Sequence, residues 1–394
     1  MSRRIKGLIQ IGLVIVILMP VYFLFFQKSY LVEVPGRQPK LVRIFEFNPQ
    51  KFVYYNFIED IEKQKPLKNP PAKIKAVYFT AFSAGNPNKI NYLINLADKT
   101  EINAVVIDIK DYSGYIAYPI ELDEVNRYQT RKITIPRINS LIKRLHDRGI
   151  YLIARITVFQ DPALAKARPD LTIKDLSGKL YQDKKDLFWV DPSSQEVWDY
   201  ILKIAIEAKS RGFDELNFDY VRFPAENSQN LVFPFWDRKT SKRQVIKSFF
   251  EYLSTNLKKE GNEIKISADL FGQTMVSQDD SGIGQIIEDA FPYFDYICPM
   301  LYPSHFNSGF LGFENPAEYP YEVVKYSMEV GLKRLSDFLS THPQFSTKIR
   351  PWIQDFDLGA IYDQEMVNKQ IKAITDSNPN SGWMLWSPRN IYSL

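Results

Sequence analysis

Two carboxylates stand at the ends of neighbouring strand-like runs of the sequence. Asp219 lies in FDELNFDYVRFP (213–224) and Asp269 lies in IKISADLFG (264–272). Hydrolysis of a glycosidic bond uses two such groups, one to donate a proton to the leaving oxygen and one to attack or stabilise the sugar centre. A buried carboxyl beside an ionised one has a raised pKa, as an acid catalyst requires. The pair therefore predicts glycoside hydrolysis, with Asp219 as nucleophile or charge stabiliser and Asp269 as general acid/base.

The two-residue alternation of the first run supports this interpretation. Glu215, Asn217 and Asp219 share one face of an extended chain, whereas Leu216 and Phe218 share the other. A polar face amid apolar residues suits a strand that lines the lumen and mouth of a barrel. Structural roles stay open, since Asp219 could pair with a nearby arginine or cap a helix, and Asp269 could cap a loop.

Further polar and aromatic residues near the ends of other runs could bind a sugar. Acidic, basic and phenolic groups would hydrogen-bond its hydroxyls, and a flat indole would stack on its apolar face. Each could equally belong to a salt bridge at the rim or to the core. The substrate-binding candidates are Asp108, Arg155, Arg222, Tyr302, His305, Trp352, Asp355 and Trp386.

The elements that must position these residues alternate from Lys73 onward. The strand candidates are 74–80, 103–110, 150–158, 215–222, 264–271, 296–302, 349–356 and 382–387, and helical stretches between them include 135–147, 194–211, 243–259, 321–339 and 364–375. Eight strands separated by helices predict an α/β fold, a (β/α)8 TIM barrel with a parallel sheet. An open doubly wound sheet is the alternative, but no glycine-rich phosphate loop follows the first strand. The longer connections follow strands 2, 3, 4 and 6, where a barrel places its catalytic loops.

Composition narrows the class of protein. The net charge of +4 is small for 394 residues and the Lys and Arg residues are dispersed, so no basic stripe indicates nucleic acid binding. The single cysteine, Cys298, allows neither an intrachain disulfide nor a cysteine-ligated metal site. Because the usual metal, phosphate-loop and serine-hydrolase motifs are missing, we expect no cofactor and no metal.

The N-terminus predicts a membrane anchor. Residues 7–26 carry no charge and are long enough to cross a bilayer, and the basic residues Arg3, Arg4 and Lys6 precede them. A cleaved signal peptide is the alternative, but its apolar region would be shorter and a small-residue cleavage site would follow. The expected organisation is a cytoplasmic tip and transmembrane signal anchor over 1–26, a proline-rich stalk over 27–72 and the barrel over 73–394. The protein would be single-pass in the cell membrane with the barrel on the extracytoplasmic side.

Five motifs in order resemble a bacterial family of predicted glycoside hydrolases whose function is uncharacterised. They are FDELNFDYVRFP (213–224), ISADLFG (266–272), PMLYPSHF (299–306), RPWIQDF (350–356) and GWMLWSP (382–388). The similarity extends over about residues 73–392. It implies a TIM-barrel fold and carbohydrate hydrolysis.

Two more distant barrel types are also similar. In the chitinase-type signature of strand 4 a proton-donating Glu stands where this chain has Val221, so that type of acid is missing here. Amylase-like barrels place carboxylates on strands 4, 5 and 7, which Asp219, Asp269 and Asp355 would match by strand order. That match is an analogy of fold, and fold alone does not determine function.

The leading hypothesis is a membrane-anchored glycoside hydrolase that cleaves an extracytoplasmic polysaccharide or glycan. A non-catalytic carbohydrate-binding barrel is the first alternative, because Val221 replaces the chitinase-type acid. The second is another extracytoplasmic barrel enzyme, such as a polysaccharide deacetylase or lyase. Sensitivity to chelation would separate a metal-dependent deacetylase from the hydrolase. The sequence indicates neither protein partners nor the sugar and linkage that would be cleaved.

Overall fold

The computed structural model describes residues 31–32, 40–41, 59–226, 228–259 and 264–394. The chain divides into two compact units, residues 1–58 and 59–394. In the first unit, β1 (Leu31–Val32) pairs antiparallel with β2 (Lys40–Leu41). The expected transmembrane segment, 7–26, lies outside the described residues. None of the helices within the described ranges is both long and apolar enough to cross a bilayer.

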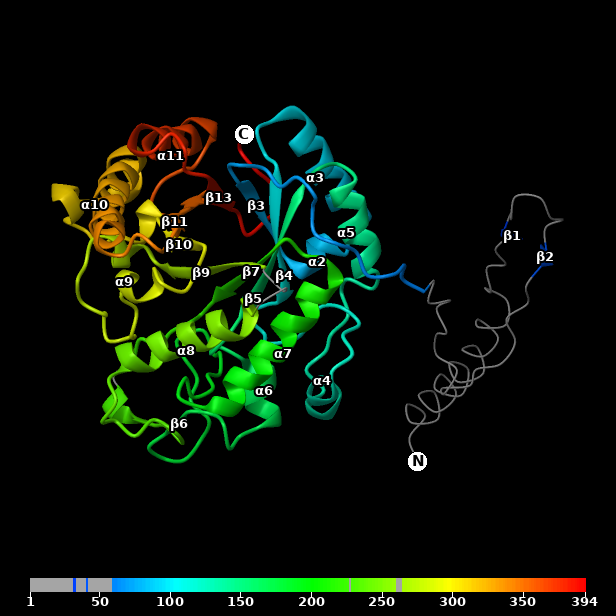
Figure 1. Ribbon diagram of the computed structural model, residues 1–394, viewed down its shortest axis with the longest axis horizontal. Coiled ribbons are helices and arrows are strands. Elements are labelled where there is room, and N and C mark those ends of the chain that lie inside the picture. The colour runs from blue at the N-terminus through cyan, green and yellow to red at the C-terminus, as the bar shows by residue number, and fades with distance from the viewer. Residues whose placement is uncertain (1–30, 33–39, 42–58, 227, 260–263) are drawn as a thin grey trace, which may run out of the picture. The chain divides into compact units, whose positions relative to one another are not determined.

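The second unit is built on a closed parallel barrel, which confirms the predicted fold (Figure 1). Its strands among the described residues are β3 (Lys75–Phe79), β4 (Ala104–Lys110), β5 (Tyr151–Thr157), β7 (Glu215–Asp219), β9 (Lys265–Phe271), β10 (Tyr296–Met300), the pair β11 (Lys348–Ile349) and β12 (Trp352–Gln354), and β13 (Trp383–Trp386). Each pairs in parallel with its neighbours, and β9 with β10 and β13 with β3 complete the circle. Counting β11 and β12 as one interrupted strand gives eight positions.

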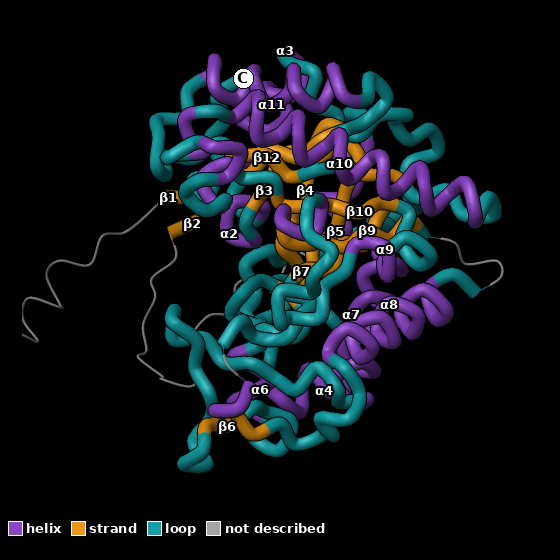
Figure 2. The backbone as a smooth tube through the Cα atoms, turned by 90° about the vertical axis from the view of Figure 1, so that its left-hand side faces the viewer, coloured by secondary structure: helices purple, strands orange, loops and turns teal. Residues whose placement is uncertain are grey.

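The strands are buried on both faces, as helices cover the outside and side chains fill the lumen. Every residue of β4 and β5 is buried, which explains their runs of Val, Ile and Leu. Figure 2 shows the strands at the centre of this unit with helices around them.

The seventh barrel strand differs from the prediction of one continuous run over 349–356. It is interrupted between β11 and β12 at Arg350 and Pro351. Proline has no N–H for the sheet ladder, which accounts for a break at this position. The Pro351 carbonyl still accepts a hydrogen bond of 2.8 Å from the Met384 backbone N–H, so the sheet is not opened.

The predicted helices form close to their expected limits. The Ser194 hydroxyl accepts from the Val197 N–H at the start of one long helix, and Gly212, at φ +104°, ends it. Only glycine enters that left-handed conformation readily, and a Cβ there would also collide with Gln64. The helices of the described residues are α2 (Ala81–Ala84), α3 (Pro87–Lys99), α4 (Asp123–Tyr128), α5 (Ile138–His146), α6 (Pro162–Ala167), α7 (Gln195–Arg211), α8 (Lys242–Leu257), α9 (Ile287–Ala290), α10 (Pro320–Thr341) and α11 (Gln364–Ser377), with 3₁₀ turns at 228–230, 272–275, 303–305, 310–312 and 316–318.

The long connections after β5 and β7 join in an arm beside the barrel mouth, which we call the β6–β8 arm (159–193 and 223–242). In it β6 (Lys174–Asp175) pairs antiparallel with β8 (Leu231–Val232). The Asp191 carboxylate accepts hydrogen bonds from the backbone N–H groups of Phe235 and Trp236, at 2.7 and 3.1 Å. Loops distant in sequence are thereby held together, and β6 lies well away from the barrel strands in Figures 1 and 2.

The second unit also includes residues 59–72, which the sequence analysis assigned to the stalk. The Asp60 carboxylate accepts from the backbone N–H groups of Asn139 and Ser140, at 2.6 and 2.9 Å. Further along, the Leu67 N–H donates to the Asp214 carboxylate at 2.6 Å. We call residues 59–72 the strap.

Candidate active site

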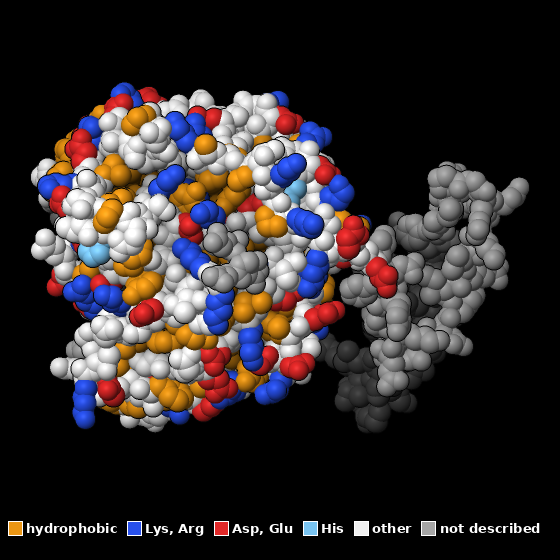
Figure 3. All heavy atoms as spheres, in the orientation of Figure 1, with side chains coloured by type: hydrophobic (Ala, Val, Ile, Leu, Met, Phe, Trp, Pro, Cys, Tyr) orange, Lys and Arg blue, Asp and Glu red, His pale blue; other side chains and the backbone are white. Residues whose placement is uncertain are grey.

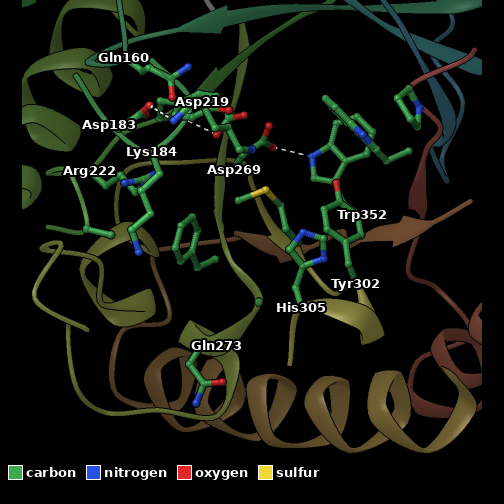
Figure 4. Close-up of a pocket in the computed structure, with 18 of the residues that line it drawn as sticks. Gln160, Asp183, Lys184, Asp219, Arg222, Asp269, Gln273, Tyr302, His305 and Trp352 are labelled. Carbon is green, nitrogen blue, oxygen red and sulfur yellow. Dashed lines mark hydrogen bonds between the residues drawn. The ribbon is translucent and has the colours of Figure 1, made fainter. Parts of the chain in front are cut away.

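A cavity of about 570 Å³ opens at the C-terminal ends of the barrel strands (Figure 4). Most of the residues proposed from the sequence meet in it. Its lining includes Arg155, Asp219, Arg222, Asp269, Tyr302, His305, Trp352 and Trp386. Asp108 and Asp355 are not part of that lining. The mouth of a (β/α)8 barrel is where enzymes of this fold place their active sites.

Arg155 is the centre of the cavity floor. Its guanidinium donates to Asp108 Oδ1 at 2.5 Å, to Asp219 Oδ2, and from Nε to Asp269 Oδ2 at 3.4 Å. All four side chains are nearly buried. One cation therefore faces three carboxylates, so the cluster has a net negative charge if all three are ionised. Burial of that excess charge is costly, and protonation of one carboxyl relieves it.

Burial raises the pKa of two carboxyls in this cluster, Asp108 and Asp269, and of these Asp269 lines the cavity. Burial, and next the charge of Asp219, raise its pKa to about 7. Its Oδ1 accepts hydrogen bonds from Asn217 Nδ2 at 2.9 Å and from Trp352 Nε1 at 2.7 Å, which hold the side chain in place. Figure 4 marks the bond between Trp352 and Asp269. A carboxylic acid with a pKa near neutrality can donate a proton and take it back, as an acid/base catalyst must.

Asp219 ends β7 directly beside Asp269. Phe218 pairs with Ala268 in the parallel register, so the next residue of each strand is one of the two acids. Asp219 is 6 % exposed, and its Oδ1 accepts from the backbone N–H of Tyr220. Tyr220 itself has φ +55°, a left-handed conformation that is uncommon for a tyrosine and turns the chain out of the strand. The turn leaves Asp219 at the cavity floor.

The polar face predicted for this strand does line the lumen. Below the two acids, buried Glu215 forms an ion pair with Arg350, whose guanidinium also lies 4.2 Å from the ring centre of Tyr296. Ser267 and Tyr151 donate further hydrogen bonds to Glu215. Because its carboxylate is satisfied deep in the barrel, we assign Glu215 a structural role.

A brace lies behind Arg155. The Tyr78 hydroxyl donates to Asp108 Oδ2 at 2.5 Å, while Asp108 Oδ1 accepts from Arg155. Trp386 stacks on Tyr78 with ring centres 3.8 Å apart and lies 5.1 Å from the Arg155 guanidinium. Asp108, expected to bind substrate, does not line the cavity, and its carboxylate contacts Arg155 and Tyr78.

Asp355 points to another part of the molecule. Its Oδ2 accepts from the Ser393 backbone N–H at 2.8 Å, and its own N–H donates to the Trp386 carbonyl. The side chain thereby fastens the C-terminal residues to β12. The amylase-like layout with a third carboxylate on strand 7 therefore does not assemble in this cavity.

Aromatic side chains form the wall opposite the β6–β8 arm. Tyr302 and His305 have ring centres 5.3 Å apart, and Phe356 lies 5.6 Å from Tyr302. Burial raises the pKa of Tyr302 well above that of a free phenol, so the hydroxyl is a donor at neutral pH. Burial also lowers the pKa of His305, which favours a neutral imidazole. In Figure 4 Tyr302, His305 and Trp352 lie on one side of the two acids.

Residues 76–392 match the protein family described as "Putative glycosyl hydrolase domain". The chain belongs to this family. No curated protein sequence matches it.

Solved structures give further matches. A hypothetical protein from Ruminiclostridium thermocellum ATCC 27405 is 34% identical, over 49% of this chain and 96% of that one, with a TM-score of 0.45. The PgaB (BpsB) glycoside hydrolase domain from Bordetella bronchiseptica is 13% identical over 81% of this chain and 95% of that one, with a TM-score of 0.58. The glycoside hydrolase domain of PelA from Pseudomonas aeruginosa is 12% identical over 82% and 97%, with a TM-score of 0.44. The Bordetella domain supports the barrel fold.

In this family member, the position of the chitinase-type acid is part of the core. Val221 is fully buried, and its carbonyl accepts from Gln285 Nε2 at 3.3 Å. Within the described residues no cluster of three or more His, Cys, Asp or Glu side chains could hold a metal ion.

Sequence reasoning missed several residues of the cavity. Phe271 is the last residue of β9 and Phe356 lies two residues beyond the end of β12, so both positions at strand ends could have been predicted from the sequence. Lys184 and Glu226 come from the β6–β8 arm, and nothing in the pattern of a long loop indicates that it folds over the mouth. The cavity residues not predicted from the sequence include Gln160, Asp183, Lys184, Lys185, Tyr220, Glu226, Phe271, Gln273 and Phe356.

Proposed function

We propose that this chain is a membrane-anchored glycoside hydrolase that cleaves an extracytoplasmic polysaccharide or glycan with Asp219 and Asp269. The supporting observation is that both acids contact one guanidinium at the floor of the cavity, where burial raises the pKa of Asp269 to about 7. Family membership supports the reaction class. The extracytoplasmic location is argued from the uncharged residues 7–26 and the basic residues before them.

In this mechanism Asp269 protonates the glycosidic oxygen as the bond to the anomeric carbon breaks. Asp219 attacks that carbon and forms a covalent glycosyl-enzyme. Asp269, now a carboxylate, takes a proton from water, and the resulting hydroxide displaces Asp219 from the sugar. Arg155 stabilises the Asp219 carboxylate before and after each cycle. Two displacements retain the configuration of the anomeric carbon, and acids on adjacent strands suit the carboxyl separation of about 5–5.5 Å in retaining enzymes.

The experiment is reducing-sugar release by the full-length protein from a panel of cell-envelope and plant polysaccharides, with the Asp219→Asn and Asp269→Asn variants beside it. We expect a loss of at least about a hundredfold in both variants, the scale of removing a general acid/base. Proton NMR of the first product should show the retained anomer. Activity that survives in Asp269→Asn would place the acid elsewhere.

A binding-only barrel is the second candidate, and buried Val221 is the observation that favours it. In that case the wild-type protein would be retained by a glycan in affinity electrophoresis and would release no reducing sugar. Asp219→Asn would then bind as well as the wild type.

A further inference from the structure

Arg222 lies on the arm side of the cavity and is held by aromatic rings. Its guanidinium carbon is 4.6 Å from the ring centre of Trp189 and 4.8 Å from that of Phe271. Nη1 donates to the Phe223 carbonyl at 3.0 Å. Stacking of this kind fixes the plane of the guanidinium and leaves its edge free to bind.

The charge of Arg222 is not paired. Among the described residues, no carboxylate forms an ion pair with Arg222, although the side chain is partly buried and lines the cavity. Burial lowers its pKa, although the charges of Asp219, Asp183 and Glu226 act in the opposite direction. A guanidinium carries five N–H donors, more than the carbonyl of Phe223 satisfies. An anion in the cavity would supply both the charge and the acceptors.

Two lysines of the β6–β8 arm line the same cavity. Lys184 and Lys185 are exposed, and neither forms an ion pair with a described residue. The neighbouring acid Asp183 is occupied by its own loop, because its carboxylate accepts from the Lys185 and Leu187 backbone N–H groups and from Trp189 Nε1. Glu226 is the other acid on this side.

The cavity is therefore electrically divided. Three cations and two carboxylates line the arm side, whereas the floor presents one cation and two carboxylates to the cavity, Arg155 with Asp219 and Asp269. Figure 4 shows Lys184 and Arg222 across the two acids from Tyr302 and His305. On the outer face seen in Figure 3, by contrast, Lys and Arg of the described residues are interspersed with Asp and Glu.

We infer that the glycan substrate carries a carboxylate, and that Arg222 binds this group with support from Lys184 and Lys185. This inference rests on the proposed function and specifies its substrate class as an acidic glycan. A sugar ring seated over Asp219 and Asp269 would contact the aromatic wall on one side and direct its carboxylate to the guanidinium edge, where two parallel N–H···O bonds can form. A neutral glycan would leave the Arg222 guanidinium without an ion-pair partner.

The test compares oligosaccharides that contain glucuronate with the same oligosaccharides after reduction of the carboxylate to a hydroxymethyl group. For the full-length wild type, kcat/KM should be at least about tenfold higher on the acidic form, the scale of a hydrogen-bonded charge pair. Arg222→Gln should reduce that ratio to near one. Equal cleavage of both forms, or a preference for the reduced form, would overturn the inference while the hydrolase assignment stands.

If no oligosaccharide is cleaved, a binding measurement still tests the preference for an acidic glycan separately from the hydrolase assignment. Saturation-transfer NMR with free glucuronate and glucose should show glucuronate bound in preference to glucose, and loss of that preference in Arg222→Gln. The absence of a preference in the wild type refutes the inference.

If Arg222→Gln does not fold, variants of the exposed lysines still test the inference. The double variant Lys184→Gln/Lys185→Gln should lower the acidic-to-reduced ratio by several-fold and weaken its dependence on salt. Lys179→Gln is the matched control, because Lys179 is exposed on the same arm but does not line the cavity. A ratio that changes equally in the control and the double variant would count against the inference.

Discussion

Replacement of Trp352 by phenylalanine should shift the pH dependence of the enzyme upward. Trp352 Nε1 donates a hydrogen bond of 2.7 Å to Asp269 Oδ1. That bond favours the ionised carboxylate, so its loss disfavours ionisation and raises the pKa of Asp269. The Asn217 amide remains as a donor to the same oxygen, which keeps the side chain oriented.

The size of the shift follows from the strength of one hydrogen bond to a charged group. Such a bond contributes about 1.5–3 kcal/mol. At about 1.4 kcal/mol for each pKa unit, the lower value corresponds to a shift of about one unit. The wild-type pKa of Asp269 is about 7, so the variant should retain its protonated acid to about pH 8.

The assay is the pH profile of kcat/KM on a cleavable substrate, whose basic limb reports the acid catalyst of the free enzyme. Trp383→Phe is the matched control: Trp383 is an equally buried tryptophan that lies in the core and is not among the donors to Asp269. We expect the control to lose stability without moving the limb. A limb that stays in place in Trp352→Phe, or moves equally in both variants, would refute Asp269 as the titrating acid.

Three further predictions concern the same floor. The Asp269→Asn variant lacks the buried charge. Because the pKa of Asp269 is raised from 3.8 to about 7 in the folded protein, the wild type loses stability as the pH rises through that range. In urea unfolding the variant should therefore be more stable than the wild type by up to about 4 kcal/mol above pH 7, and by little near pH 4. A stability difference that does not grow with pH would contradict this. Asp108→Asn should lower kcat about tenfold with little change in KM, since Asp108 holds Arg155 rather than touching substrate; a change confined to KM would argue for substrate contact. Incubation with EDTA should leave activity intact, because Arg155 already bridges the three carboxylates that could have bound a cation; restoration of a lost activity by a divalent metal would point to a metalloenzyme.

Strand alternation is the part of the site that the sequence encodes most directly. In a closed barrel one face of each strand must point into the lumen, so the period of two was enough to place Asn217 and Asp219 inside. The same rule, applied to β12, separates Trp352 from Asp355. Trp352 points inward to Asp269, and Asp355, three residues on, lies on the outer side. The comparison with amylase-like barrels placed Asp355 in the site without taking this alternation of side chains into account.

Roles that depend on partners from several strands could not be read from the chain. Asp108 becomes a brace only because Tyr78 and Arg155 come from the strands on either side of it. Lys184 and Glu226 line the same cavity although they come from two separate long loops, which pair with each other at β6 and β8. In both cases the deciding contact is between residues whose separation in sequence gives no periodic signal.

The strap determines how mechanical load would reach the barrel. A pull on the chain before Glu59 would first act on the hydrogen bonds between Asp60 and the start of α5, and then on those from Gln64 and Leu67 to Arg211 and Asp214. Only after these had broken would tension arrive at β3 and its ladders with β4 and β13. A tethered protein that holds a polymer substrate under drag would thus yield first in a segment that carries no catalytic residue, and the geometry of the two acids would survive that yielding.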